Sequence, residues 1–77
     1  MPSDKRAQLS NRIRRFRFEH NEMTQQELAT KVGVTRQTII AVEAGKYVPS
    51  LLLALRIARA FNVPVEEVFQ LKDEVEE

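Results

Sequence analysis

The chain has 77 residues, which suits one small domain, and a formal net charge of +1. A chain this short buries only about 60% of the surface that its unfolded form exposes, so association with a second copy would help to stabilise it. It contains no cysteine, which excludes disulfides and thiolate metal sites and fits a cytoplasmic location. No signal peptide or membrane span is expected, because the longest apolar run, Leu51 to Leu55, is far below the ~20 residues that a bilayer requires.

The small net charge hides an uneven distribution along the chain. Residues 1–46 hold nine Lys and Arg against five Asp and Glu, whereas residues 47–77 hold three against six. Most of the basic charge comes from a short arginine cluster: Arg12, Arg14, Arg15 and Arg17. Such a cluster attracts phosphate backbones, with a solvated helix face as the simpler alternative for this segment alone.

The N-terminal part of the chain is predicted to be an arm followed by a helix. Residues 1–6 show no periodicity and are expected to form a mobile arm. Apolar residues recur at helical spacing from Leu9 to Phe16 and predict a first helix from about Ala7 to His20. Phe18 lies off that apolar stripe, and the sequence leaves open whether it packs beside the core or is exposed.

Two further helices are expected on either side of Gly33. Thr24, followed three residues later by Glu27, has the pattern of a capping box, which starts a helix. Gly33 can adopt the left-handed conformation that ends this helix, and Thr35 then provides the N-cap of the next one. Gly45 is expected to end that second helix. Two helices joined by three residues form a helix-turn-helix.

The rest of the chain is predicted to form two more helices. Ser50 caps a fourth helix that ends near Asn62, and a short fifth helix follows, with two glutamates in its first turn. No segment alternates with period two over the length of a strand, so the fold class is all-α, with a helical domain over residues 7–71. Residues 72–77 form an acidic tail. The expected inward stripe of the fourth helix comprises Leu51, Ala54, Ile57, Ala58 and Phe61.

These residues resemble the Cro and lambda-repressor-like helix-turn-helix family, also called XRE, in its short single-domain form. The resemblance covers about residues 9–71. It is most specific in Met-Thr-Gln-Gln-Glu-Leu-Ala (23–29), Val-Gly-Val-Thr-Arg-Gln-Thr-Ile (32–39), Glu-Ala-Gly-Lys-Tyr (43–47) and Pro-Ser-Leu (49–51). The resemblance implies a compact five-helix domain whose second helix crosses the DNA backbone and whose third helix lies in the major groove of double-stranded DNA. Members usually bind pseudo-palindromic sites as dimers, so we expect a transcriptional regulator, most simply a repressor that occludes its site.

The candidate DNA-binding residues lie in and around the helix-turn-helix. Arg36 and Gln37 are expected on the side of the third helix that faces away from the core. Arg can bond guanine O6 and N7, and Gln can bond adenine N6 and N7, each worth about 1–3 kcal/mol of discrimination. For Arg36 the alternative is a phosphate contact, and Ile40 either meets a thymine methyl or packs internally. The full set of candidates is Gln25, Thr35, Arg36, Gln37, Thr38, Ile40, Lys46 and Tyr47.

The remaining candidates are assigned to the DNA backbone by the resemblance. It implies a phosphate contact for Gln25 at the start of the second helix, with simple solvation as the alternative. It implies backbone contacts for Lys46 and Tyr47, whereas Thr35 and Thr38 are lesser candidates. For Thr35 the alternative is a capping role alone.

An ion pair between Arg17 and Glu43 is also implied by the resemblance. If this pair is desolvated, loss of one partner would cost about 3–5 kcal/mol, so we expect it to serve the fold rather than the reading of bases.

A homodimer is predicted because the fourth helix is apolar beyond its inward stripe, and such a helix is normally buried on two sides. A two-fold dimer would place two recognition helices about 34 Å apart, one turn of B-DNA. The expected interface residues are Leu52, Leu53, Leu55, Val65, Val68, Phe69 and Leu71.

The sequence supports other functions less well than DNA binding. An enzyme is not expected, because the chain has one histidine, His20, no cysteine and no glycine-rich phosphate loop. No cofactor, metal or small-molecule effector is indicated. The alternative is a protein-binding module, either an antitoxin that masks a toxin or a bridging factor. Only residues 1–6 and 72–77 are available as a toxin-binding extension, which favours a DNA-binding regulator.

Overall fold

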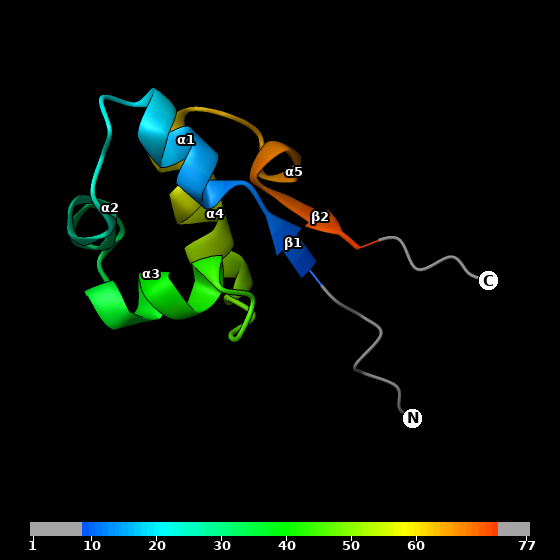
Figure 1. The fold of residues 1–77 in the computed structure, drawn as a ribbon. Helices are drawn as coiled ribbons and strands as arrows, with labels where there is room; N and C mark the ends of the chain where they lie inside the picture. Colours follow the sequence, from blue (N-terminus) through cyan, green and yellow to red (C-terminus); the bar gives the residue numbers. More distant parts are fainter. Residues whose placement is uncertain (1–8, 73–77) are drawn as a thin grey trace.

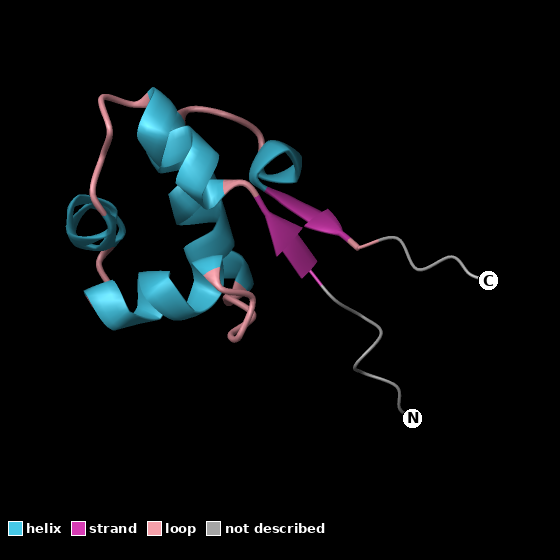
Figure 2. Ribbon diagram, viewed as in Figure 1, coloured by secondary structure: helices cyan, strands magenta, loops and turns pink. Residues whose placement is uncertain are grey.

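The computed structural model describes residues 9–72, which form five helices and a two-stranded sheet (Figures 1 and 2). Figure 1 shows α2 and α3 on one side of the domain and the sheet on the other. The predicted arm, the first two residues of the predicted first helix, and the predicted tail beyond Lys72 lie outside the described residues. In chain order the elements are β1 (Leu9–Asn11), α1 (Ile13–Glu19), α2 (Gln25–Val32), α3 (Arg36–Glu43), α4 (Leu51–Phe61), α5 (Val65–Val68) and β2 (Phe69–Leu71).

The predicted start and stop residues of α2 and α3 are confirmed. The Thr24 hydroxyl accepts a hydrogen bond from the Glu27 backbone N–H at 2.9 Å, and the Glu27 carboxylate accepts one from the Thr24 N–H at 2.8 Å. Gly33 ends α2 at a φ of 81°, which an L side chain rarely adopts. Thr35 caps α3 with its side chain, and Gly45 follows the end of α3 with a φ of 75°. These local bonds fix the angle at which α3 leaves α2.

One apolar core holds the helices together. Ile39 and Val42 of α3 pack into it beside residues from α1, α2, α4 and α5, and Phe16 stacks on Phe61 with ring centroids 5.4 Å apart. Each fully buried side chain of this size contributes about 1.5–3 kcal/mol. The inner face of α3 is therefore committed to the core, and its outer face is left to solvent. The core residues are Ile13, Leu28, Ala29, Val32, Ile39, Val42, Leu53, Ile57, Ala58, Phe61 and Val68.

The prediction of an all-α fold is wrong in one respect, because β1 and β2 pair as antiparallel strands (Figure 2). Leu9 lies opposite Leu71 and Asn11 opposite Phe69 in this sheet. Residues 9–11, which were predicted to lie in the first helix, are therefore extended, and α1 begins only at Ile13. Asn11 is one physical reason, because its side-chain oxygen accepts the Ile13 N–H at 3.1 Å and so offers the backbone an alternative to the helix.

The buried face of α4 also differs from the prediction. Leu51 was expected to point inward, but it is 73% exposed, whereas Leu53 is in the core. Because residues 51–55 are all apolar, periodicity alone could not determine which of them face inward. Leu53 and Val68 were predicted to lie at a dimer interface, and burial within the single chain removes both from that surface. No helix of the described part is long and apolar enough to cross a membrane.

The turn between α1 and α2 is made without glycine. Asn21 and Glu22 both have a positive φ, of 61° and 55°. Asparagine tolerates this conformation, but for glutamate it costs about 1–2 kcal/mol. The Met23 backbone N–H donates to the Arg17 carbonyl at 2.8 Å and holds the turn against the end of α1.

Candidate nucleic-acid interface

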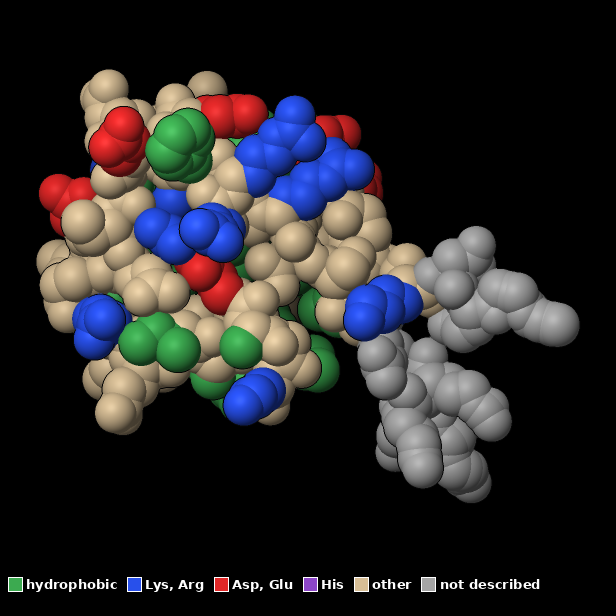
Figure 3. Space-filling model, in the orientation of Figure 1, with side chains coloured by type: hydrophobic (Ala, Val, Ile, Leu, Met, Phe, Trp, Pro, Cys, Tyr) green, Lys and Arg blue, Asp and Glu red, His purple; other side chains and the backbone are tan. Residues whose placement is uncertain are grey.

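The outer side of α3 presents a set of side chains that the fold does not use. Arg36 and Gln37 are exposed in the first turn of α3, and neither side chain bonds any residue among 9–72. Ile40, one turn further on, is 36% exposed and is not part of the core, so internal packing does not account for it. Figure 3 shows α3 at the edge of a face on which hydrophobic side chains lie between basic ones. This combination of guanidinium, amide and methyl groups matches the donors and apolar contacts that read base edges in a major groove.

Four other predicted residues border this surface at the two ends of α3. Thr35 is exposed, and its hydroxyl caps α3 by accepting the Thr38 backbone N–H at 3.2 Å. The hydroxyl of the half-buried Thr38 lies 3.1 Å from that of Thr35. Lys46 and Tyr47 are exposed in the loop that leads from α3 to α4. A cation and a phenol are both side chains that can bond phosphate oxygens.

A largely buried ion pair joins α3 to the other two helices of the site. Arg17 of α1 donates from Nε to Glu43 Oε2 at 2.6 Å and from Nη2 to Oε1 at 3.1 Å. Its Nη1 donates to the Met23 carbonyl at 2.8 Å, just before α2 begins. The side chains of Arg17 and Glu43 are only 15% and 10% exposed. The implied pairing of these two residues is therefore present, and its position favours a structural role.

Gln25 makes a contact within the protein that was not predicted from the sequence. Its side chain is half-buried and its amide donates to Glu43 Oε1 at 3.2 Å. Gln25 therefore joins the start of α2 to the end of α3 through the same carboxylate that holds Arg17. Simple solvation does not describe this residue, and a phosphate contact would depend on the amide proton that Glu43 does not bind.

Asn11 takes part in the same arrangement and was not singled out from the sequence. Its side-chain N–H₂ donates to the carbonyls of Val42 and Glu43 at 3.1 and 3.4 Å, which are the last carbonyls of α3. The last carbonyls of a helix lack their usual partners within it. The Val42 carbonyl also accepts the Gly45 N–H at 3.1 Å, so Asn11 gives it a second donor and gives the Glu43 carbonyl a donor as well. An asparagine two residues before the start of α1 was the available sequence signal, but its partner is 31 residues away.

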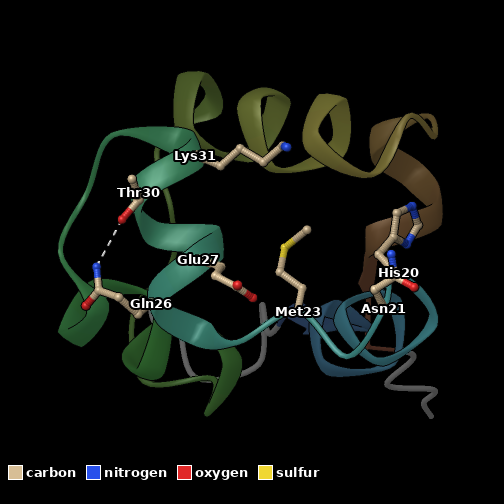
Figure 4. Close-up of a pocket in the computed structure, with 7 residues that line it drawn as sticks. All are labelled: His20, Asn21, Met23, Gln26, Glu27, Thr30 and Lys31. Atoms are coloured by element: carbon tan, nitrogen blue, oxygen red, sulfur yellow. Dashed lines mark hydrogen bonds between the residues drawn. The ribbon is translucent and has the colours of Figure 1, made fainter.

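The described part of the chain offers little that resembles a ligand or metal site. A shallow pocket lies beside α2, where the Met23 side chain projects between the helix and the turn that carries His20 (Figure 4). Its polar residues are exposed, and Gln26 and Thr30 bond one another at 3.1 Å across its edge. Within residues 9–72 no group of three His, Asp or Glu side chains could hold a metal ion.

The fold and the exposed side of α3 define a helix-turn-helix domain. The chain belongs to the helix-turn-helix family, whose model matches residues 13–68. This match begins at the start of α1 and ends with α5, so it covers all five helices and leaves out both strands.

Named relatives agree with this assignment. The chain is 50% identical over 66 residues to the uncharacterised HTH-type transcriptional regulator MJ0272 of Methanocaldococcus jannaschii, covering 86% of this chain and 98% of the relative. It is 54% identical to an uncharacterised HTH-type transcriptional regulator of Archaeoglobus fulgidus, covering 86% and 93%. It is also 34% identical to the cryptic phage CTXphi transcriptional repressor RstR of Vibrio cholerae, covering 77% of this chain and 52% of RstR. None of these three relatives is named as an enzyme.

A solved structure resembles the fold. The crystal structure of a candidate DNA-binding protein from Bacteroides fragilis superposes with a TM-score of 0.69 at 26% identity, covering 80% of this chain and 98% of that one.

Proposed function

We propose that this chain is a sequence-specific regulator of transcription that inserts α3 into the major groove of double-stranded DNA. The observation that carries the proposal is the division of α3 into two sides. Ile39 and Val42 are buried, while Arg36 and Gln37 are exposed and engage no side chain of the described residues. Side chains that are held in place and left unbonded suit a partner that supplies both acceptors and donors, as base edges do.

Within this proposal the residues divide into those that read bases and those that position the protein. Arg36 and Gln37 bond base edges, and Ile40 contacts a thymine methyl. The positioning residues bond the sugar-phosphate backbone and carry no sequence information themselves. They are Gln25, Thr35, Thr38, Lys46 and Tyr47.

Repression is the proposed effect on transcription. RstR is named a transcriptional repressor, and a small domain that covers a promoter needs no further activity to block it.

A homodimer is part of the proposal, because a single recognition helix reads few base pairs. Three of the predicted interface residues are exposed in the single chain, namely Leu52, Leu55 and Leu71. Val65 and Phe69, also predicted for the interface, are half-buried against the core. Two copies related by a two-fold axis would place their α3 helices about 34 Å apart, which matches one turn of B-DNA.

Selection from random duplexes tests the proposed function. The wild-type protein should enrich a pseudo-palindromic sequence. Arg36→Ala should then relax preference at one base position in each half-site, while Lys46→Ala should weaken all sequences alike and lower the salt slope by about one unit. Equal loss on all sequences from both variants would show that the assigned roles are wrong. Enrichment of no sequence, together with retained binding of a protein partner by an Arg36→Ala/Gln37→Ala variant, would favour an antitoxin or bridging role.

A further inference from the structure

The outward side of α1 carries a basic groove that has no role in the fold. The groove measures about 470 Å³ and is lined by Asn11, Arg12, Arg14, Arg15 and Phe18. Phe18 is 67% exposed, so of the two positions that the sequence allowed, beside the core or at the surface, it takes the surface. An exposed aromatic ring beside three guanidinium groups offers a partner both an apolar contact and positive charge.

The positive charge of this groove is only partly neutralised within the described chain. The side chain of Arg14 makes no hydrogen bond or ion pair with any of residues 9–72. Arg15 pairs with Glu19 at 3.2 Å, but both side chains are more than half exposed. Arg12 reaches Glu67 only at 3.8 Å and is similarly exposed. Surface pairs of this kind contribute little and are readily exchanged for a stronger anion.

The position of the groove relates it to α3. Arg14 lies three residues before Arg17 on α1, so the two side chains project from neighbouring positions on one side of the helix. Arg17 in turn binds Glu43, the last residue of α3. Figure 3 shows Lys and Arg side chains gathered over α1 and continuing toward α3 on the same face of the molecule. A duplex that receives α3 in its groove would therefore pass close to α1.

We propose that this α1 groove binds the phosphate backbone of the same duplex, at base pairs that flank those read by α3. Arg14 and Arg15 contact phosphates, and Phe18 packs against the deoxyribose between them. This inference rests on the proposed function and adds a second contact surface, outside the helix-turn-helix, that contributes affinity without sequence preference.

The test compares two duplexes over a range of salt concentrations. One duplex contains only the base pairs that α3 protects, and the other extends them by several base pairs on each side. Arg14→Gln should lower the slope of log affinity against log salt on the long duplex by about 0.9 for each bound protomer, because each releases one fewer counterion. Between 50 and 200 mM salt the wild-type advantage over Arg14→Gln should therefore shrink about 3.5-fold for each bound protomer. On the short duplex the two proteins should bind alike.

Three controls separate a phosphate contact from other causes. Arg14→Lys keeps the charge and should keep the wild-type slope. Phe18→Ala should weaken binding to the long duplex at every salt concentration without changing the slope, because it removes no charge. Arg59→Gln removes an exposed charge that lines a different groove, beside the end of α2, and should change nothing on either duplex.

The outcomes distinguish this inference from the function on which it rests. If wild type binds both duplexes and Arg36→Ala relaxes its preference, an unchanged slope for Arg14→Gln on the long duplex overturns the α1 contact alone. The same result would favour an acidic protein, in place of DNA, as the partner of the groove. If wild type binds neither duplex, the proposed function and the α1 contact both fail.

Discussion

Arg17 and Glu43 form a bidentate ion pair that joins α1 to the last residue of α3 across 26 positions of sequence. Both side chains are largely removed from solvent, so each charge depends on the other for compensation. Because Arg17 also bonds the Met23 carbonyl and Glu43 also accepts from Gln25, the pair connects all three helices of the proposed interface. The orientation of the recognition helix is thus fixed by polar contacts on one side and by the core on the other.

Removing either charge of this pair should destabilise the whole domain. We expect Arg17→Ala or Glu43→Ala to lower the free energy of unfolding by about 3–5 kcal/mol, since each leaves an uncompensated charge in a largely buried position. The melting temperature should fall by at least about 12 °C in a domain of this size. Replacing both residues with Met and Leu should recover most of the loss. As a control, Arg15→Ala breaks only the exposed pair with Glu19 and should change stability by no more than about 0.5 kcal/mol. A small effect of the single Arg17 or Glu43 variants would mean that the pair is solvated in solution.

Asn11 should stabilise α3 from outside the helix-turn-helix. Asn11→Ala removes the donor to the Val42 and Glu43 carbonyls and the acceptor for the Ile13 N–H, and we expect a cost of about 1–3 kcal/mol in chemical denaturation. Asn11→Asp keeps the acceptor but places a negative charge against the C-terminal end of α3, where the helix dipole is unfavourable to it. The aspartate variant should therefore be no more stable than the alanine variant. An aspartate variant as stable as wild type would show that the contact with α3 is unimportant.

Glu22 should be replaceable by glycine with a gain in stability. Its φ of 55° is strained for any side chain, whereas glycine adopts it freely. We expect Glu22→Gly to raise the free energy of unfolding by about 0.5–1 kcal/mol, and the melting temperature by a few degrees. Arg56→Gly, in the middle of α4, should do the opposite and cost about 1 kcal/mol. A destabilised Glu22→Gly variant would mean that the turn between α1 and α2 relaxes in solution.

The exposed leucines of α4 should control the oligomeric state. Leu52→Ser combined with Leu55→Ser leaves the core intact, because both side chains are exposed in the single chain. In sedimentation at micromolar concentration, wild type should run as a dimer of the 8.9-kDa chain and the double variant as a monomer. The variant should also bind a two-half-site duplex more weakly than wild type, with less effect on a single half-site. Wild type that sediments as a monomer would contradict the predicted dimer.

Features that depend on neighbouring residues were predictable from the sequence. The capping box at Thr24 and the left-handed Gly33 depend on hydrogen bonds between residues a few positions apart. Both are present as predicted. The strands were not predictable, because each has three residues and its partner lies about 60 positions away. An alternating pattern can be recognised only over about four to eight residues, which is longer than either strand.

The site shows the same division between local and distant determinants. Exposure of Arg36 and Gln37 followed from the amphipathic pattern of α3. The contacts of Gln25 and Asn11 with the end of α3 required knowledge of which helices meet, and no local pattern supplied it. A continuous apolar run such as residues 51–55 likewise does not reveal which side faces inward, which is why Leu53 was assigned to the wrong surface.

The most direct test of the central claim is a titration of the selected duplex at low ionic strength with wild type and with the Arg36→Ala/Gln37→Ala variant. Both side chains are exposed, so the variant should fold and melt like wild type. We predict that it binds the selected and a scrambled duplex with equal, weak affinity, whereas wild type prefers the selected duplex by at least about 30-fold, the lower end of what two base-reading contacts provide. A variant that retains the wild-type preference would contradict the assignment of α3 as the element that reads DNA.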